Sequence, residues 1–299
     1  MKKRLTIVVT LLLLTAAFSF PQTVSAAAVP YQSITADLDG VPREKVGNYY
    51  IWAKDTVNSQ GVRTGSKLLL SKDGKTIKTL KSFKGKTKSI TPIIITNGST
   101  IFYAVNNGNE TGTIYQTTYT GKKHTKITTI KLLANVAAYY NGKIYYSRAT
   151  DSGWYDYNLY SYNIKTKKTK LVRKHVVSES QYGRYLTCGQ KRFDVENRKQ
   201  YIINLKTGKM NRLPDGKQTQ VDGKKVYYWK YTSYDTLKRE LKVCSLTGKN
   251  AKTLKKLSEG GYPLYFGRTF ARFDDTKEGV TDYIYAAGET LDKNTLLGK

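Results

Sequence analysis

The chain has 299 residues, of which 51 are lysine or arginine and 22 are aspartate or glutamate, so its formal net charge is +29. Two cysteines and two histidines are too few for a disulfide framework, and their spacing supports neither a zinc site nor a serine triad, so no cofactor is expected. The excess of positive charge favours negatively charged partners.

The first segment has the form of a secretory signal peptide. Basic residues at positions 2–4 precede an apolar run from Leu5 to Phe20, and small residues follow around Ser25. We expect a signal peptide over residues 1–27, whose removal takes away three basic residues and lowers the net charge from +29 to +26. The run is short for a membrane span and no cysteine follows it for lipidation. The mature protein is therefore expected to be secreted, either extracellular or associated with the cell wall.

Residues 132–172 show the pattern of four consecutive strands. A hydrophobic run at 132–140 is followed by Asn141-Gly142, a two-residue turn that requires positive φ. β-branched and aromatic residues then predict strands at 143–148, 158–164 and 169–172, with a polar loop at 149–157 and a turn at 165–168. Four antiparallel strands of this kind form one blade of a β-propeller.

The rest of the chain repeats this pattern. Each repeat begins with a glycine turn, and successive turns are 40 to 51 residues apart. The sequence therefore predicts an all-β, six-bladed β-propeller over residues 47–299, with four antiparallel strands per blade. An N-terminal segment at 28–46 contains a candidate closing strand, Tyr31 to Leu38, expected to pair with the last blade. The glycine turns lie at Gly47, Gly98, Gly142, Gly183, Gly223 and Gly267.

Two phrases recur with this repeat. One is an aspartate or asparagine, glycine, lysine, aliphatic residue and Tyr-Tyr, as in Asp222 to Tyr228, and the other ends in Thr-Gly-Lys, as in Leu241 to Lys249. From about Val41 onward the chain resembles the TolB-like and low-density-lipoprotein-receptor-like six-bladed propellers of secreted bacterial proteins. It lacks the YWTD tetrad of the receptor propellers and a hydrolase domain, so the resemblance implies a fold and no catalytic residue.

Most of the 25 tyrosines occupy strand positions, where packing between blades is the expected role. Trp52 and Trp229 share a repeat position with Ser147 and Cys188 and are predicted to be core residues. An aromatic pair in the predicted loop at 149–157 does not fit the blade pattern, and aromatic side chains beside polar groups suit carbohydrate or peptide ligands. The predicted ligand-binding residues are Asp151, Trp154, Tyr155 and Asp156.

Charge follows the repeat. The loops between second and third strands hold most carboxylates, whereas the turns between third and fourth strands, with the outer strands, hold lysines. Lysine on an edge strand discourages aggregation, but this excess is larger than that role needs. We interpret the lysines as a surface for an anionic cell-wall polymer or an envelope protein. The predicted polymer-binding residues are Lys165, Lys167, Lys168 and Lys170.

The sequence thus predicts a secreted, monomeric, non-enzymatic binding or scaffolding propeller on the anionic cell envelope. Two alternatives stay open. A carbohydrate-active enzyme, either a glycoside hydrolase or a lyase, would use carboxylates of the acidic loops, and two of them facing each other in a pocket at the ring axis would favour it. Extracellular nucleic-acid binding would use the same basic surface.

Overall fold

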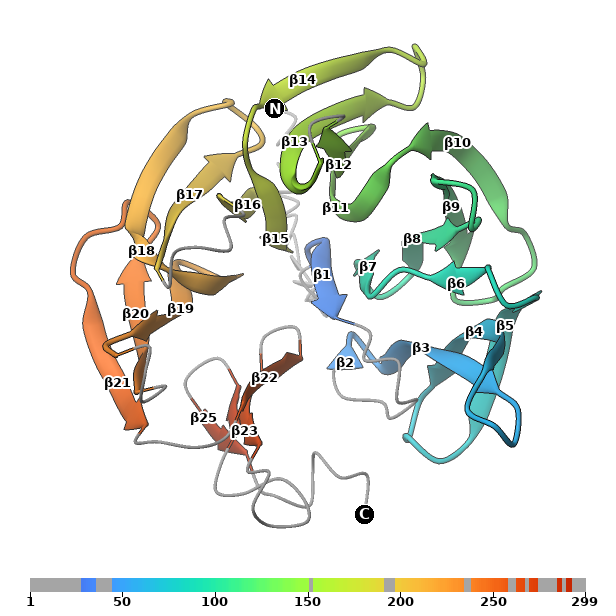
Figure 1. Ribbon diagram of the computed structural model, residues 1–299, viewed down its shortest axis with the longest axis horizontal. Coiled ribbons are helices and arrows are strands. Elements are labelled where there is room, and N and C mark those ends of the chain that lie inside the picture. The colour runs from blue at the N-terminus through green and yellow to red at the C-terminus, as the bar shows by residue number, and fades with distance from the viewer. Residues whose placement is uncertain are drawn as a thin grey trace, which may run out of the picture.

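The computed structural model describes residues 28–35, 45–150, 153–190, 197–233, 238–257, 262–266, 269–273, 284–286 and 289–291. Within these ranges the chain forms antiparallel β-strands joined by turns, and no helix is present, so the predicted all-β class is confirmed. No helix in the described ranges is long and apolar enough to cross a membrane. Figure 1 shows arrays of strands arranged around a common centre.

Some arrays are separate four-stranded sheets, each in chain order. The first contains β2 (Lys45–Val46), β3 (Tyr49–Val57), β4 (Arg63–Ser71) and β5 (Ile77–Lys84). Another contains β11 (Leu133–Tyr140), β12 (Lys143–Thr150), β13 (Gly153–Asn163) and β14 (Thr169–Arg173). The last contains β22 (Tyr262–Phe266), β23 (Thr269–Phe273), β24 (Ile284–Ala286) and β25 (Glu289–Leu291).

A 13-stranded sheet follows the order β10-β9-β8-β7-β1-β15-β16-β17-β18-β19-β20-β21, with β6 (Ser89–Ile90) paired to β8. One side contains β7 (Ile93–Thr96), β8 (Thr100–Asn106), β9 (Thr111–Thr118) and β10 (Thr125–Lys131). The other contains β15 (Val177–Tyr182), β16 (Tyr185–Gly189), β17 (Arg198–Asn204), β18 (Met210–Asp222), β19 (Lys225–Tyr231), β20 (Arg239–Ser245) and β21 (Lys252–Leu257). Because β18 has 13 residues, its first half pairs with β17 and its second half with β19.

The sheet β11–β14 confirms the four strands predicted for residues 132–172, but the loop predicted at 149–157 is wrong. β12 continues to Thr150 and β13 begins at Gly153, so only two residues separate these strands. Thr150 is the register partner of Gly153, whereas Ala149 is the partner of Tyr157. Residues 154–156 are therefore a bulge in one strand, because the pairing resumes beyond them.

The glycine turns have the predicted conformation. Asn141 and Gly142 have φ values of 44° and 73°, and the repeat glycines at 47, 98, 183 and 223 also have positive φ, whereas Gly267 lies outside the described residues. The Ile164 N–H donates to Gly142 O (3.0 Å), which ties the end of the third strand to the turn between the first two. Both kinds of turn therefore lie on one face of the ring, which we name the turn face. The opposite face, with the second-to-third-strand loops and the links between arrays, is the loop face.

The core lies between neighbouring arrays. The four predicted equivalents Trp52, Ser147, Cys188 and Trp229 are each at most 1% exposed, which confirms that this repeat position is buried. Phe102 of β8 and Tyr139 of β11 stack across one junction, with ring centroids 4.4 Å apart. Both cysteines are buried and free. Burial of large apolar side chains is thus distributed around the ring.

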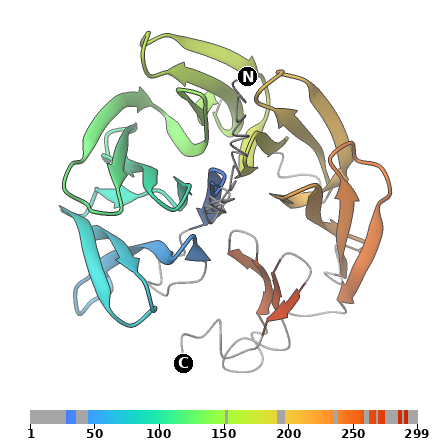
Figure 2. The same ribbon diagram turned by 180° about the vertical axis from the view of Figure 1, so that it is seen from behind.

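The expected pairing of residues 31–38 with the last blade is wrong for the part of this segment that the structure describes, whereas residues 36–38 lie outside the described residues. β1 (Gln32–Thr35) pairs with β7 along its whole length and meets β15 at Gln32, and among the described strands it pairs with neither β22 nor β25. It lies at the centre of the ring (Figures 1 and 2). The Gln181 N–H donates to Ser33 Oγ (2.7 Å). β1 therefore has hydrogen-bond partners on both sides, in β7 and in β15. The Gly183 N–H donates to Tyr31 O (2.7 Å), so β1 starts at the turn face.

Candidate functional site

The turn face carries exposed lysines on every third-to-fourth-strand turn that the structure describes. These turns lie at 72–76, 119–124, 164–168, 205–209 and 246–251, and they contain ten exposed lysines and one carboxylate, that of Asp73. The lysines are Lys72, Lys75, Lys122, Lys123, Lys165, Lys167, Lys168, Lys206, Lys209 and Lys249. We name this set the turn lysines.

Asp73 forms hydrogen bonds within its own turn and no ion pair with a described turn lysine. Its Oδ1 accepts hydrogen bonds from the N–H groups of Lys75 (2.8 Å) and Thr76 (2.7 Å), and from Ser71 Oγ (3.0 Å). The backbone hydrogen bond from Thr76, followed by that from Lys75, holds the pKa of Asp73 well below its usual range. Within the described ranges, no turn lysine lies at ion-pair distance from a carboxylate.

The turn of β13 and β14 presents the predicted polymer-binding residues together. Asn163 Oδ1 accepts hydrogen bonds from the N–H groups of Lys165 and Thr166 (3.0 Å each), and the Asn163 N–H donates to Lys168 O (2.9 Å). This side chain fixes the turn locally, as asparagine commonly does. Lys165, Lys167, Lys168 and Lys170 are all exposed. Three of the predicted lysines therefore lie on an ordered turn, and Lys170 lies in β14 directly after it.

The predicted ligand-binding residues are only partly placed. Asp151 lies outside the described residues, and Trp154 and Tyr155 are described through their backbone, in the bulge of β13. The carboxylate of Asp156 contacts His175 Nδ1 at 2.9 Å and 3.0 Å and accepts a hydrogen bond from Thr150 Oγ1 (3.3 Å). Asp156 thus has partners within the protein, which the spacing of aromatic residues could not reveal.

A pocket of about 540 Å³ lies on the loop face near this bulge, where β8–β9 meet β11–β13. Lys131 and Glu110 contribute its charges, and Glu110 supplies the one carboxylate among its described lining residues. Glu110 and Leu132 have φ values of 57° and 55°, an uncommon conformation for side chains of this kind. The repeat pattern does not predict this pocket, because nothing in the sequence marks a positive φ at Leu132. The lining residues are Asn106, Gly108, Glu110, Thr111, Lys131, Leu132, Leu133, Ala134, Ala149, Thr150 and Tyr157.

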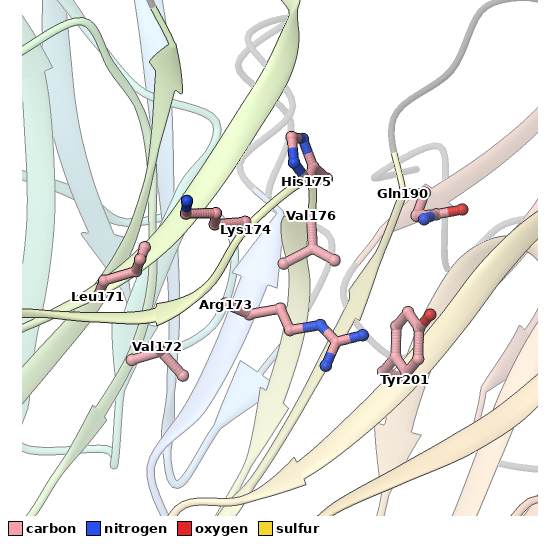
Figure 3. A pocket seen from close by; sticks show the side chains of 8 residues that line it. All are labelled: Leu171, Val172, Arg173, Lys174, His175, Val176, Gln190 and Tyr201. Atoms are coloured by element: carbon pink, nitrogen blue, oxygen red, sulfur yellow. The ribbon is translucent and has the colours of Figure 1, made fainter.

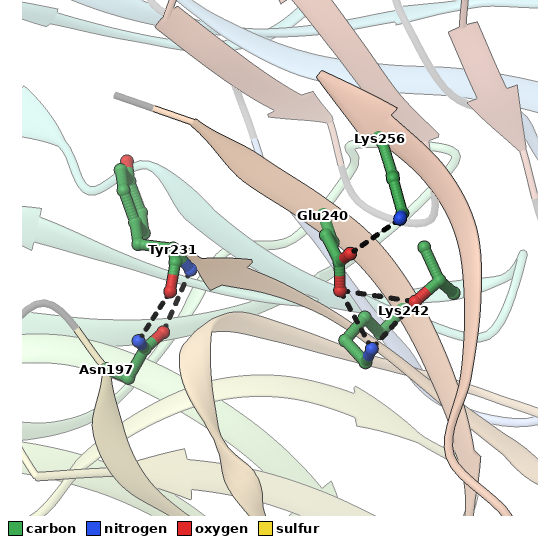
Figure 4. A network of polar contacts seen from close by, with 6 residues as sticks. Asn197, Tyr231, Glu240, Lys242 and Lys256 are labelled. Atoms are coloured by element: carbon green, nitrogen blue, oxygen red, sulfur yellow. Dashed lines mark hydrogen bonds and ion pairs between the residues drawn. The ribbon is translucent and has the colours of Figure 1, made fainter. Parts of the chain in front are cut away.

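Several loop-face carboxylates are paired with cations. Asp55 Oδ2 lies 3.2 Å from Arg63, and Glu240 lies 2.9 Å from Lys242 and 4.0 Å from Lys256 (Figure 4). The hydrogen bond from Lys242 lowers the pKa of Glu240. In the described part of the chain, these carboxylates face cations rather than one another. The other carboxylates expected on this face, Asp194, Glu196, Asp235, Asp274, Asp275 and Glu278, lie outside the described residues.

The two histidines occupy different environments. The Tyr103 hydroxyl lies 2.8 Å from His124 Nδ1, and His124 Nε2 lies 3.0 Å from Leu80 O. Both ring nitrogens of His124 therefore have hydrogen-bond partners within the protein, and burial lowers the pKa of this side chain. His175 is exposed and contacts Asp156. The described residues contain no cluster of three or more histidine, cysteine or acidic side chains that could hold a metal ion.

Comparison with solved structures defines the class of fold. TolB from Acinetobacter baumannii superposes with a TM-score of 0.52 at 14% identity, over 87% of this chain and 61% of that chain. The β-propeller domain of the Trilobed protease from Pyrococcus furiosus gives 0.54 at 11% identity, over 87% and 82%, and oligogalacturonate lyase in complex with manganese gives 0.54 at 11%, over 87% and 77%. The chain thus has a TolB-like β-propeller fold.

The similarity to these structures concerns the fold and does not extend to function. This chain spans about three fifths of the TolB chain that it matches, and the neighbours carry names of different activities. No protein-family model matches the sequence, and no curated protein matches it. The neighbours' names include a lyase, a protease and TolB, whose name states no activity, so the function has to be argued from this chain's own surface.

Proposed function

We propose that this chain is a secreted, six-bladed β-propeller with four strands per blade, and that it is a non-enzymatic binding or scaffolding module on an anionic cell envelope. In this proposal residues 1–27 are a signal peptide, residues 28–46 supply the central strand, and residues 47–299 form the blades. The protein acts as a monomer and contacts a cell-wall polymer or an envelope protein through the turn face. Its location is extracellular or at the cell wall.

The observation that carries the proposal is the placement of the turn lysines. Lysine that protects a sheet from aggregation belongs on an edge strand, and the edge strands β5, β10, β14 and β21 do contain lysines. The turn lysines lie beyond the strand ends, where they protect no edge. They are nevertheless present on every described third-to-fourth-strand turn, and none has a carboxylate at ion-pair distance among the described residues. A phosphate-rich polymer, such as a teichoic acid of a Gram-positive wall, provides charge of the opposite sign for this whole face.

The strength of such an interaction is set by counterion release and by the number of lysines engaged. A lysine near an anionic surface contributes about 1 kcal/mol, so four contribute about 4 kcal/mol, or roughly a thousandfold in affinity. Each contact is weak and exposed, so retention should fall steeply with salt. A surface of this kind holds the protein in place and leaves its loop face accessible.

The test is charge reversal with a matched control. The variant replaces Lys165, Lys167, Lys168 and Lys170 with glutamate, and the control makes the same change at four exposed lysines away from the turn face. Retention on a purified glycerol-phosphate wall polymer is measured from low to physiological salt. We expect affinity for the polymer to fall by at least about a thousandfold in the variant, because reversal removes four attractive charges and adds four repulsive ones, and far less in the control. The control lysines are Lys84, Lys86, Lys88 and Lys230.

Equal losses in the two proteins would overturn the proposal, since they would show a response to net charge alone. Nucleic acid is the competing partner for the same face. Competition between duplex DNA and the wall polymer at matched salt separates them, and displacement of the polymer by equivalent amounts of DNA phosphate would favour nucleic-acid binding.

A further inference from the structure

A second pocket, of about 410 Å³, lies at the loop-face end of β14, where this strand approaches β16 and β17 (Figure 3). The link from β14 to β15 forms one wall, and Gln190 and Tyr201 form the other. The lining residues are Leu171, Val172, Arg173, Lys174, His175, Val176, Gln190 and Tyr201. Three of them carry or can acquire positive charge, and none of these eight carries a carboxylate.

Arg173 is held in place by an aromatic ring. Its guanidinium carbon lies 4.8 Å from the centroid of Tyr201, and Figure 3 shows the side chain extended toward that ring, whereas Lys174 points the other way. Such stacking is attractive and restricts a flexible side chain. Among the described residues, the Arg173 guanidinium has no carboxylate within ion-pair distance and donates to no protein oxygen. Its donors are therefore positioned and available.

Arg212 is the useful comparison, because its guanidinium contacts the same ring at 5.3 Å. Arg212 forms an ion pair with Asp215, and it donates to the carbonyl oxygens of Gln200 (3.1 Å) and Leu213 (3.2 Å). Its donors are thus used within the protein. Of the two guanidinium groups on Tyr201, the one that lines the pocket is the one without an acceptor.

His175 adds a second group to the same wall. Its Nδ1 contacts the carboxylate of Asp156 at 2.9 Å, which orients the ring and directs Nε2 away from that carboxylate. The backbone of His175 has a φ of 58°, and its N–H donates to Asn158 Oδ1 (3.1 Å), so the link that carries it is fixed at its base. The side chain is nevertheless 67% exposed. The imidazole is anchored on one side and open on the other.

We propose that this pocket binds a single phosphate-type oxyanion, with Arg173 as the principal ligand and His175, Gln190 and the Tyr201 hydroxyl as further contacts. A guanidinium fork matches two oxygens of a phosphate. The guanidinium of Arg173 alone could bind both oxygens of a carboxylate. A tetrahedral anion has further oxygens, which can accept hydrogen bonds from Gln190 and from the Tyr201 hydroxyl on the opposite wall. The volume leaves room for the group to which the phosphate is attached. This site is separate from the turn lysines and does not depend on them.

The test is a titration with inorganic phosphate and with glycerol phosphate, followed by calorimetry and by protein chemical shifts at physiological salt. Arg173→Gln removes the proposed ligand, and Lys230→Gln removes the same charge from an exposed position outside both the pocket and the turn face. We expect saturable one-to-one binding, weakened about 10- to 100-fold by Arg173→Gln, as expected for hydrogen bonds to a charged group, and less than about twofold by Lys230→Gln. Tighter binding of glycerol phosphate than of phosphate would identify an esterified ligand, and equal binding would identify the free anion.

Equal weakening by the two variants, or binding that does not saturate, would overturn the inference. Arg173 is exposed, so its replacement is not expected to disturb folding, and a thermal melt checks this. Tyr201→Phe provides a second variant that keeps the ring under Arg173 and removes only the hydroxyl. Wall-polymer retention by the Arg173 variant is measured separately, so failure of this site and failure of the turn face are distinguishable.

Discussion

Replacing Ile34 with alanine tests whether the central strand holds the ring together. Ile34 is 1% exposed and belongs to a buried cluster that includes Val46, Leu68, Ile94 and Ile101, from four other strands. Truncation of a buried isoleucine to alanine typically costs about 2 to 5 kcal/mol, through lost transfer energy and the cavity that remains. The upper half of this range applies where the surroundings cannot collapse. β1 is fixed on both sides by β7 and β15, so we expect a loss of about 3 to 5 kcal/mol.

Urea unfolding of the mature chain, followed by tryptophan fluorescence, measures this loss, provided the slope with denaturant is unchanged. Val29→Ala is the matched control, because Val29 lies on the same segment and is 36% exposed, where a change of about 0.5 kcal/mol or less is expected. If Ile34→Ala cost less than about 1 kcal/mol, or no more than the control, the central strand would be an accessory to the fold and our reasoning would be refuted.

Further predictions concern other parts of the chain. Gly142→Ala should cost about 1 kcal/mol in urea unfolding for conformational reasons alone, since φ is 73° and an added Cβ meets nothing within 4 Å. The lowered pKa of His124 means that the unfolded chain binds its proton more readily, so stability should fall as the pH drops below about 6.5, and His124→Gln should reduce this slope. Trp154→Ala should leave folding and polymer retention intact while weakening binding of a neutral sugar or peptide ligand, and a loss of several kcal/mol in stability would argue instead for a buried indole. Deletion of Tyr283 to Lys299 should abolish cooperative folding, and a well-folded monomeric truncation would contradict ring closure.

Local signals account for the parts of the fold that the sequence predicts. Asn141-Gly142 demands positive φ whatever surrounds it, and alternation of β-branched and aromatic residues defines the strands beside it. The burial of Trp52 follows from its repeat position. The polar composition of residues 149–157 is misleading, because polar residues at the end of a blade can remain paired in a strand that tolerates a bulge. Polar side chains in a segment do not tell whether its backbone is hydrogen-bonded to a neighbouring strand, and only the strand register shows this.

Tertiary contacts account for what the sequence does not predict. β1 has only four residues, and its sequence contains no pattern that predicts which strands it pairs with. Its position between β7 and β15 depends on the arrangement of the whole ring. The exposure of the turn lysines follows from the repeat, whereas the pocket of Arg173 depends on the approach of Tyr201 from a neighbouring array. No regular spacing of residues in the sequence marks a stacking contact between Arg173 and Tyr201.

The two candidate surfaces lie on opposite faces, and this arrangement bears on how they act. Because the Gly183 N–H donates to Tyr31 O, β1 begins at the turn face. Along β14, Lys168 of the turn precedes Arg173 by five residues, about 17 Å at roughly 3.3 Å per residue. This distance is about two Debye lengths at physiological salt, so screening weakens the effect of charge bound at the turn on the potential at Arg173. A wall polymer held by the lysines would therefore leave the oxyanion pocket facing away from the wall, and the two ligands should bind at the same time without competing.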